Sequence, residues 1–264
     1  MIRVGPAGWS YPDSPGHIYP AGLAKSFDVL AFSAAYFDTI EINASFYAPQ
    51  PVRNCASWVK RVAGNANFRF TAKLWRRFTH GLKAEGSKLK EPWTADDVRA
   101  VTEGMQILRD AGRLGAILAQ FPWSFQPSAY SLQLLERLAE AFQQWPVVVE
   151  LRHGAWARHE HALLLQRLGL GFCNIDQPVI GDSLGPTAGV TSDLGYVRFH
   201  GRRYDRWFAE HEDAAQRYDY LYTAEELAPW VERIRTVAAA EGVGDVYVIS
   251  NNHFEGKGPA NALM

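Results

Sequence analysis

The sequence has little cysteine and no long hydrophobic run. Cys55 and Cys173 are its two cysteines among 264 residues, and neither lies in a Cys-X-X-Cys pair. This excludes a disulfide framework and a cysteine-ligated metal centre, and isolated thiols are typical of the reducing cytoplasm. The longest apolar runs, GAILA and VVV, are far shorter than the roughly 20 residues that span a bilayer. Early Gly and Pro residues also argue against a secretion signal, so we expect a soluble cytoplasmic protein with no membrane partner.

An excess of charge of either sign is also missing. The chain has 27 Lys and Arg residues against 28 Asp and Glu residues, which gives a formal net charge of −1. This balance argues against a protein that holds long nucleic acid by bulk charge, although a local basic patch stays open. With 47% hydrophobic and 21% charged residues, the composition is that of an ordinary globular chain. No repeat or linker divides it, so we predict one domain over residues 1–264.

Several nucleotide-binding and hydrolase motifs are absent. No Gly-X-Gly-X-X-Gly follows the first apolar run, and neither a P-loop nor a Gly-X-Ser-X-Gly elbow occurs. We therefore expect no cofactor. The sequence does contain short β-branched or apolar runs that alternate with amphipathic stretches, which is the pattern of a parallel sheet covered by helices. Eight candidate strands begin at Ile2, Asp38, Phe68, Gly115, Val147, Gly171, Tyr196 and Val246.

Helix-start signals support the amphipathic stretches. Thr223 with Glu226 has the pattern of a capping box, Thr94 with Asp97 is an acidic version of it, and Ser128 is placed to cap a third helix. The predicted helices cover residues 25–36, 52–62, 95–113, 129–144, 156–168 and 224–241.

One connection between strands differs from the others. Residues 177–195 are rich in Gly, Pro, Asp and Ser and have no helical periodicity, so we expect this crossover to lack a regular helix. Eight strands with helical crossovers in about 250 residues fit a (β/α)8 TIM barrel better than an open doubly wound sheet. The predicted fold class is therefore α/β, as a single TIM barrel.

Polar residues stand at the ends of most of the predicted strands. Active sites of TIM barrels lie at these carboxyl ends, and side chains two residues apart along a strand share a face. The phase that contains Glu41 or Arg198 is polar, whereas the opposite phase is apolar. We therefore expect a charged cluster in the lumen near its mouth, formed by Glu41, Lys73, Glu150, Arg152, Asp176, Arg198 and His200.

These residue types suggest acid–base chemistry on an anionic ligand. Carboxylates and imidazole move protons, so the catalytic candidates are Glu41, Glu150 and His200. Cationic side chains hold phosphate or carboxylate groups, which gives a clamp of Lys73, Arg152 and Arg198. The other predicted substrate-binding residues are Asn43, Tyr47, His80, Gln120, Trp156, Asp176, Arg202, Asn251 and Asn252.

Two other interpretations of the same residues stay open. Charges inside a barrel are costly to bury unless they are paired, so the cluster could be a purely structural network of ion pairs. An oxygen-rich metal site is the second, because Glu41, Glu150, Asp176 and His200 could supply ligands. We predict no metal, since the neighbouring cations oppose a bound divalent ion and the last strand ends in two amides.

The chain also resembles a known family across nearly its whole length. The blocks FDTIEINASFY, FRFTAKLWRRFTH, VVVELRHGAW, YVRFHGR and VISNNHFEGKGPANAL occur in the order found in the domain of unknown function 72 family (YecE-like). The resemblance implies a TIM barrel, but no reaction, because the activity of that family is not established. Its motif positions fall on most of the candidate residues above and also on His153, Gly201 and Asn261.

Three functions follow as hypotheses. The first is an enzyme with hydrolase-type acid–base chemistry on a small anionic substrate, such as a sugar phosphate or a nucleotide fragment. The second is a nucleic-acid binder or repair-type endonuclease, which predicts a basic flap that includes Arg76, Arg77, Lys83, Lys88 and Lys90. The third is a sensor that binds a metabolite at the same mouth without turnover. The oligomeric state stays open.

Overall fold

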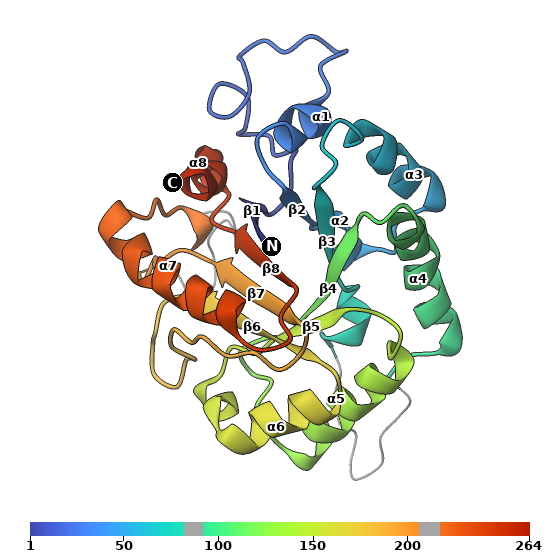
Figure 1. Ribbon diagram of the computed structural model, residues 1–264, viewed down its shortest axis with the longest axis vertical. Helices are drawn as coiled ribbons and strands as arrows, with labels where there is room; N and C mark the ends of the chain where they lie inside the picture. The colour runs from blue at the N-terminus through green and yellow to red at the C-terminus, as the bar shows by residue number, and fades with distance from the viewer. Residues whose placement is uncertain (82–91, 206–216) are drawn as a thin grey trace.

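Eight parallel strands form one sheet that curves into a nearly closed barrel (Figure 1). The computed structural model describes residues 1–81, 92–205 and 217–264, and within them the sheet order is β1-β8-β7-β6-β5-β4-β3-β2. This confirms the predicted α/β fold, a (β/α)8 TIM barrel. The strands are β1 (Ile2–Pro6), β2 (Thr39–Ile42), β3 (Arg69–Lys73), β4 (Leu114–Gln120), β5 (Val147–Glu150), β6 (Gly171–Asp176), β7 (Leu194–Phe199) and β8 (Asp245–Ser250).

The barrel closes where β1 approaches β2. Ala7 and Glu41 form a single parallel bridge, and the Gly8 amide donates to the Glu41 carbonyl at 2.8 Å. Gly5 makes this approach possible, because a Cβ there would lie 1.8 Å from the carbonyl oxygen of Thr39. The closure therefore fixes the end of β2 that carries Glu41.

Helices cover the outside of the barrel, and their starts follow the sequence signals. The capping boxes at Thr94 and Thr223 and the cap at Ser128 are all present. The first predicted helix begins later than expected, because Asp28 accepts hydrogen bonds from Leu30 and Ala31 and so caps it at Val29. The helices are α1 (Val29–Ala34), α2 (Ala44–Tyr47), α3 (Val52–Arg61), α4 (Ala95–Asp110), α5 (Ala129–Ala141), α6 (His159–Arg167), α7 (Ala224–Ala239) and α8 (Lys257–Leu263).

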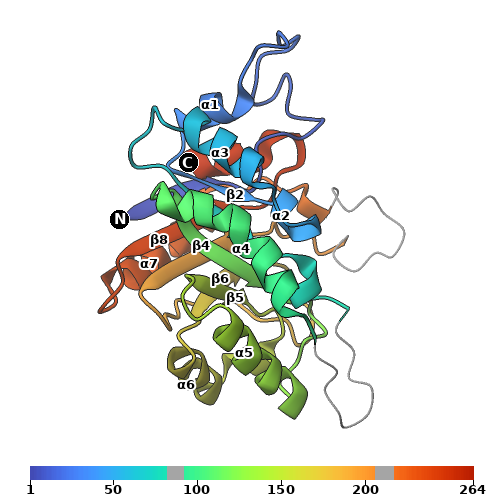
Figure 2. The same ribbon diagram turned by 90° about the vertical axis from the view of Figure 1, so that its right-hand side faces the viewer.

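Two short helices were not predicted, and both follow strand ends. α2 comes directly after β2, and α8 packs beside β1 and β8 (Figure 1). Figure 2 shows the N-terminus at one end of the barrel and α2 at the other. α2 therefore belongs to the end where the strands finish.

The crossover from β6 to β7 contains no helix, as predicted for residues 177–195. Side-chain hydrogen bonds to the backbone hold it instead: Gln177 donates to the carbonyls of Arg152 and Leu184, and Asn174 donates to the carbonyl of Gly189. None of the helices in the described ranges combines the length and apolar character needed to cross a bilayer.

Candidate functional site

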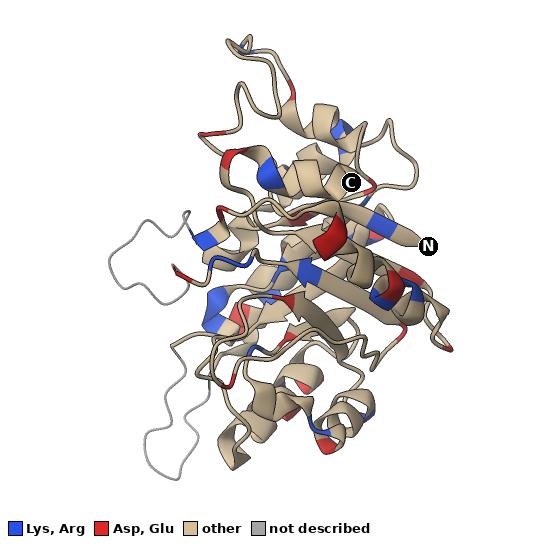
Figure 3. Ribbon diagram, turned by 90° about the vertical axis from the view of Figure 1, so that its left-hand side faces the viewer, with Lys and Arg blue, Asp and Glu red and all other residues tan. Residues whose placement is uncertain are grey.

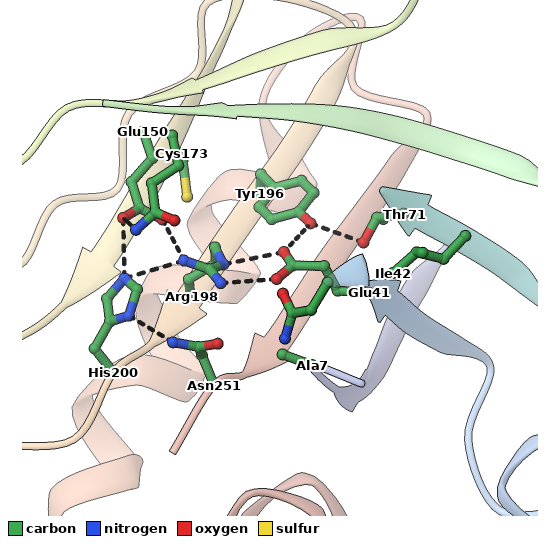
Figure 4. A network of polar contacts seen from close by, with 12 residues as sticks. Ala7, Glu41, Ile42, Thr71, Glu150, Cys173, Tyr196, Arg198, His200 and Asn251 are labelled. Atoms are coloured by element: carbon green, nitrogen blue, oxygen red, sulfur yellow. Dashed lines mark hydrogen bonds and ion pairs between the residues drawn. The ribbon is translucent and has the colours of Figure 1, made fainter. Parts of the chain in front are cut away.

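Arg198 joins two buried glutamates from opposite sides of the barrel (Figure 4). Its Nε and Nη2 donate to the carboxylate of Glu41 at 3.0 and 2.7 Å, and its Nη1 donates to Glu150 Oε2 at 2.5 Å. The three residues come from β7, β2 and β5 and are at most 1% exposed. Glu41 also accepts from the Tyr196 hydroxyl at 3.0 Å, which itself lies 2.8 Å from the hydroxyl of Thr71. All three guanidinium nitrogens of Arg198 therefore donate hydrogen bonds to carboxylates.

Glu150 is the second centre of this network. Its Oε1 accepts from Gln120 Nε2 at 3.0 Å and from Arg152 Nε at 2.7 Å. Burial alone would raise the pKa of Glu150, but Arg198, His200 and Arg152 outweigh it and hold the pKa well below the ordinary value. The Glu150 side chain is therefore a permanent anion at neutral pH.

His200 is fully buried between Glu150 and Asn251. Its Nε2 lies 3.2 Å from Glu150 Oε1, and its Nδ1 lies 3.0 Å from Asn251 Nδ2. Burial lowers the pKa of His200 to about 3, against the opposing effect of Glu150. The imidazole is therefore neutral at pH 7 and is held in place by its contacts with Glu150 and Asn251.

Lys73, at the end of β3, lies outside this network of paired groups. Its Nζ is 4.1 Å from the centroid of the Phe46 ring, and it forms no hydrogen bond or ion pair with any residue that the structure describes. Burial and the positive charge of Arg198 lower the pKa of Lys73 to about 7, although Glu41 and Glu150 act in the opposite sense.

His80 packs beside the same ring. Its imidazole meets Phe46 edge to face at 5.1 Å, and its Nδ1 lies 2.8 Å from the Thr79 hydroxyl. Burial, Lys73 and Arg76 lower the pKa of His80 to about 4. Lys73, His80, Gln120 and Arg152 are all partly exposed, unlike the buried carboxylates. They form the partly exposed part of the cluster.

An aromatic row continues from the network along the ends of β1 and β8. Tyr11 and His253 stack with ring centroids 4.2 Å apart and planes inclined by 2°, and Tyr218 lies 5.3 Å from His253. Asn43 Nδ2 donates to the Tyr11 hydroxyl at 3.0 Å, whereas the buried Asn43 Oδ1 has no partner. This oxygen is an unused acceptor beside the network.

Asp176 and Arg202 lie elsewhere and form an outer cluster. Asp176 accepts from Trp230 Nε1 at 2.5 Å and the Tyr222 hydroxyl at 2.7 Å, and Arg202 binds both of its carboxylate oxygens. Trp230 belongs to α7 and packs with Phe199 on the outer phase of β7. The expected position of Asp176 in the lumen is therefore wrong, because even-numbered residues of β6 face outward and Cys173 faces the glutamates (Figure 4).

Three other candidates lie away from the cluster. Tyr47 is 70% exposed and packs against Phe46. Trp156 is buried, stacks on Phe125 and donates its indole N–H to the Phe125 carbonyl at 2.7 Å. Asn252 donates to Asn261 Oδ1 at 2.8 Å and to the carbonyl of Tyr220, which ties the C-terminal segment to the barrel.

The remaining motif positions have structural contacts. His153 Nδ1 accepts from the Ala155 amide, and Gly201 has a φ of 87°.

In the ranges 1–81, 92–205 and 217–264, no three His, Cys, Asp or Glu side chains converge as metal ligands. Of the expected basic flap, Lys83, Lys88 and Lys90 lie outside the described residues.

Three members of the site were not among the predicted site residues. Tyr196 shares the strand phase of Arg198 and His200, and the two-residue alternation of that strand indicates this. Phe46 lies in the four-residue helix α2 and Tyr11 in the loop after β1, and both segments are too short for a periodicity that would predict which side chains reach the lumen.

Comparison with known proteins gives the family. The family model described as "Protein of unknown function DUF72" matches residues 3–264. The chain belongs to the DUF72 family. This DUF72 protein is 30% identical over 275 residues to the UPF0759 protein YunF of Bacillus subtilis (strain 168), covering 99% of this chain and 92% of YunF.

Solved structures support the same assignment. A DUF72 family protein from Thermotoga maritima MSB8 superposes with a TM-score of 0.85 at 33% identity, over 100% of this DUF72 chain and 96% of that chain. A DUF72 family protein from Enterococcus faecalis V583 gives a TM-score of 0.82 at 26% identity, over 100% and 93% of the two chains. The family carries no established activity, so the chemistry has to be argued from the site.

Proposed function

We propose that this DUF72 protein is an enzyme that binds a small anionic substrate at the carboxyl end of its barrel and acts on it by proton transfer. The observation that carries the proposal is Lys73, an ammonium group at a strand end with no carboxylate partner among the described residues. Sugar phosphates and nucleotide fragments are the substrate class that fits, and a cytoplasmic setting agrees with the two buried free thiols.

The charges of the cluster favour an anion. Glu41 and Glu150 contribute two negative charges, and Arg198 and Arg152 balance them. A protonated Lys73 then adds one positive charge that these carboxylates do not neutralise. A phosphate or carboxylate group bound beside Lys73 and Arg152 would neutralise this extra positive charge and accept hydrogen bonds from these side chains.

The contacts also favour a revised division of roles. Glu41 and Glu150 are buried acceptors whose oxygens are occupied, so they suit the positioning of Arg198 better than proton transfer. Arg198 in turn suits the role of a positioning residue rather than an anion clamp. Lys73 is the group that both exchanges protons near pH 7 and is partly exposed.

Ligand-dependent thermal stability tests the proposal. A ligand at about 100 times its Kd adds about 2.7 kcal/mol, which raises the Tm of a chain of this size by about 5 °C or more. We expect sugar phosphates or nucleotides to do so, Lys73→Met to lose the shift, and the exposed Lys60→Met to keep it. An unchanged shift in Lys73→Met would remove Lys73 from the site. Binding with no turnover in any assay would instead indicate a sensor.

The aromatic row of Tyr11, His253 and Tyr218 favours a second candidate, a protein that stacks bases of single-stranded nucleic acid. It requires a basic surface beyond the cluster, but Arg77 pairs with Asp97, and Figure 3 shows both charge signs spread over the face it presents. Oligonucleotide binding with a steep salt dependence would support this candidate, and binding without any salt slope would count against it.

A further inference from the structure

We infer that Lys73 is an amine nucleophile that forms an imine with its substrate, and that the substrate class is an aldehyde or ketone that carries an anionic group. The inference rests on the proposed anion site and narrows it from anions in general to anionic carbonyl compounds.

The amine of Lys73 differs from the other lysines that the structure describes. Lys25 and Lys60 are exposed on the surface, and Lys257 pairs with Asp219 and lies 3.5 Å from Glu255. Lys73 alone of these combines partial burial with an ammonium that has no oxygen partner. An amine held by a carboxylate would have to break that bond before it attacked a carbonyl carbon, and Lys73 has none to break.

Burial is the main cause of the lowered pKa of Lys73, and the charged groups around it add to this effect or oppose it. Arg198 from β7 and Arg152 after β5 disfavour the ammonium form, and His80 and Arg76 follow β3 on the same side. Glu41 from β2 and Glu150 from β5 favour the ammonium form, but both are already bound to Arg198. With a pKa lowered to about 7, much of Lys73 is neutral at pH 7.5, whereas about one in a thousand molecules of an ordinary lysine is neutral there.

The reaction balances without any further reagent. The neutral Nζ adds its lone pair to the carbonyl carbon, and the carbonyl oxygen takes up the proton that Lys73 had released. The resulting carbinolamine loses its oxygen as water and leaves a protonated imine. Of the three hydrogens of the original ammonium, one remains on nitrogen and two leave with the water, so the charge is unchanged.

Neighbouring groups suit the rest of such a substrate. Arg152, whose side chain is 14% exposed, adds positive charge near Lys73, which suits the anionic group. Asn43 Oδ1 is a buried acceptor without a partner, and a hydroxyl of the substrate would satisfy it. Asn43 immediately precedes α2, which carries the Phe46 ring that packs on Lys73. An open-chain hydroxy-aldehyde or hydroxy-ketone phosphate would have all three features.

Borohydride trapping tests the covalent step on the full chain. We would incubate the protein with glyceraldehyde 3-phosphate, add sodium borohydride, and locate the adduct by peptide mass spectrometry. We expect one adduct per chain on Lys73, none on Lys73→Met, and wild-type trapping in Lys60→Met. Glycerol 3-phosphate is the matched ligand without a carbonyl, so it should raise the Tm without forming an adduct.

These outcomes separate the two proposals. If both phosphates raise the Tm and no adduct forms on Lys73, the imine is overturned and the anion site stands. If neither phosphate raises the Tm and none is trapped, the anion site falls and the imine falls with it. Competitive labelling with acetic anhydride gives a readout that needs no substrate: labelling of Lys73 should reach half-maximum near pH 7, and a midpoint of about pH 10, the value of an ordinary lysine, would overturn the inference.

Discussion

This barrel contains two charged clusters of arginine and carboxylate side chains, and they differ in whether all their charged groups are paired. In the lumen, Arg198 binds Glu41 and Glu150, whereas on the outer face Arg202 binds Asp176. The carboxylate of Asp176 in the outer cluster also accepts hydrogen bonds from Tyr222 and Trp230, so these partners are all side chains of the protein itself. The lumen cluster instead continues into a partly exposed lysine with no oxygen partner among the described residues. A paired acid at a strand end therefore does not by itself mark a site, and the group left without a partner is the better guide.

The largest expected effect of a single change in either cluster is the loss of Arg198. Arg198→Met would leave Glu41 and Glu150 buried without their shared counter-charge, which typically costs about 3–5 kcal/mol. Urea denaturation should show this loss in the free energy of unfolding. The exposed Arg99→Met is the matched control and should stay within about 0.5 kcal/mol of wild type. Equal stability of both variants would mean that Arg198 does not hold the lumen network together.

A smaller loss is expected in the outer cluster. Asp176→Leu leaves the Trp230 indole and the Tyr222 hydroxyl without an acceptor, but Arg202 is 27% exposed and can turn to water. We therefore expect a loss of about 2–3 kcal/mol in the free energy of unfolding. Anion-dependent thermal stabilisation should be unchanged. If Asp176→Leu kept its free energy of unfolding but sugar phosphates no longer raised its Tm, Asp176 would belong to the functional site and the outer cluster would not be purely structural.

The pH dependence of stability at Lys73 tests the partly exposed part of the lumen cluster. Because burial lowers the folded-state pKa to about 7, the unfolded chain binds more protons than the folded chain between about pH 7 and pH 10. Stability from this group therefore rises with pH across that window and is constant below it. Lys73→Met should be more stable than wild type at pH 6, and the difference should shrink as the pH rises to 10. A constant difference across this range would show that Lys73 has an ordinary pKa.

The two clusters also show why part of the site could be predicted and part could not. Glu41, Glu150, Arg198 and His200 were predicted to face the lumen because alternation along a strand is local, and their contacts confirm it. Asp176 was placed wrongly because β6 is buried on both faces, so the alternation from Cys173 to Asp176 does not show which phase faces the lumen. In the barrel the apolar phase with Cys173 faces the lumen, and the polar phase with Asp176 faces outward.

The eight strands, the capped starts of α4, α5 and α7, and the helix-free crossover before β7 were predictable from the sequence, since these depend on local periodicity and turn chemistry. The bridge from one arginine to two glutamates and the packing of Lys73 on Phe46 rather than on a carboxylate depend on the tertiary structure. Such partners are distant in sequence and meet only after the barrel closes. Their distances, and the pKa values that follow from burial, depend on how the strands are staggered around it.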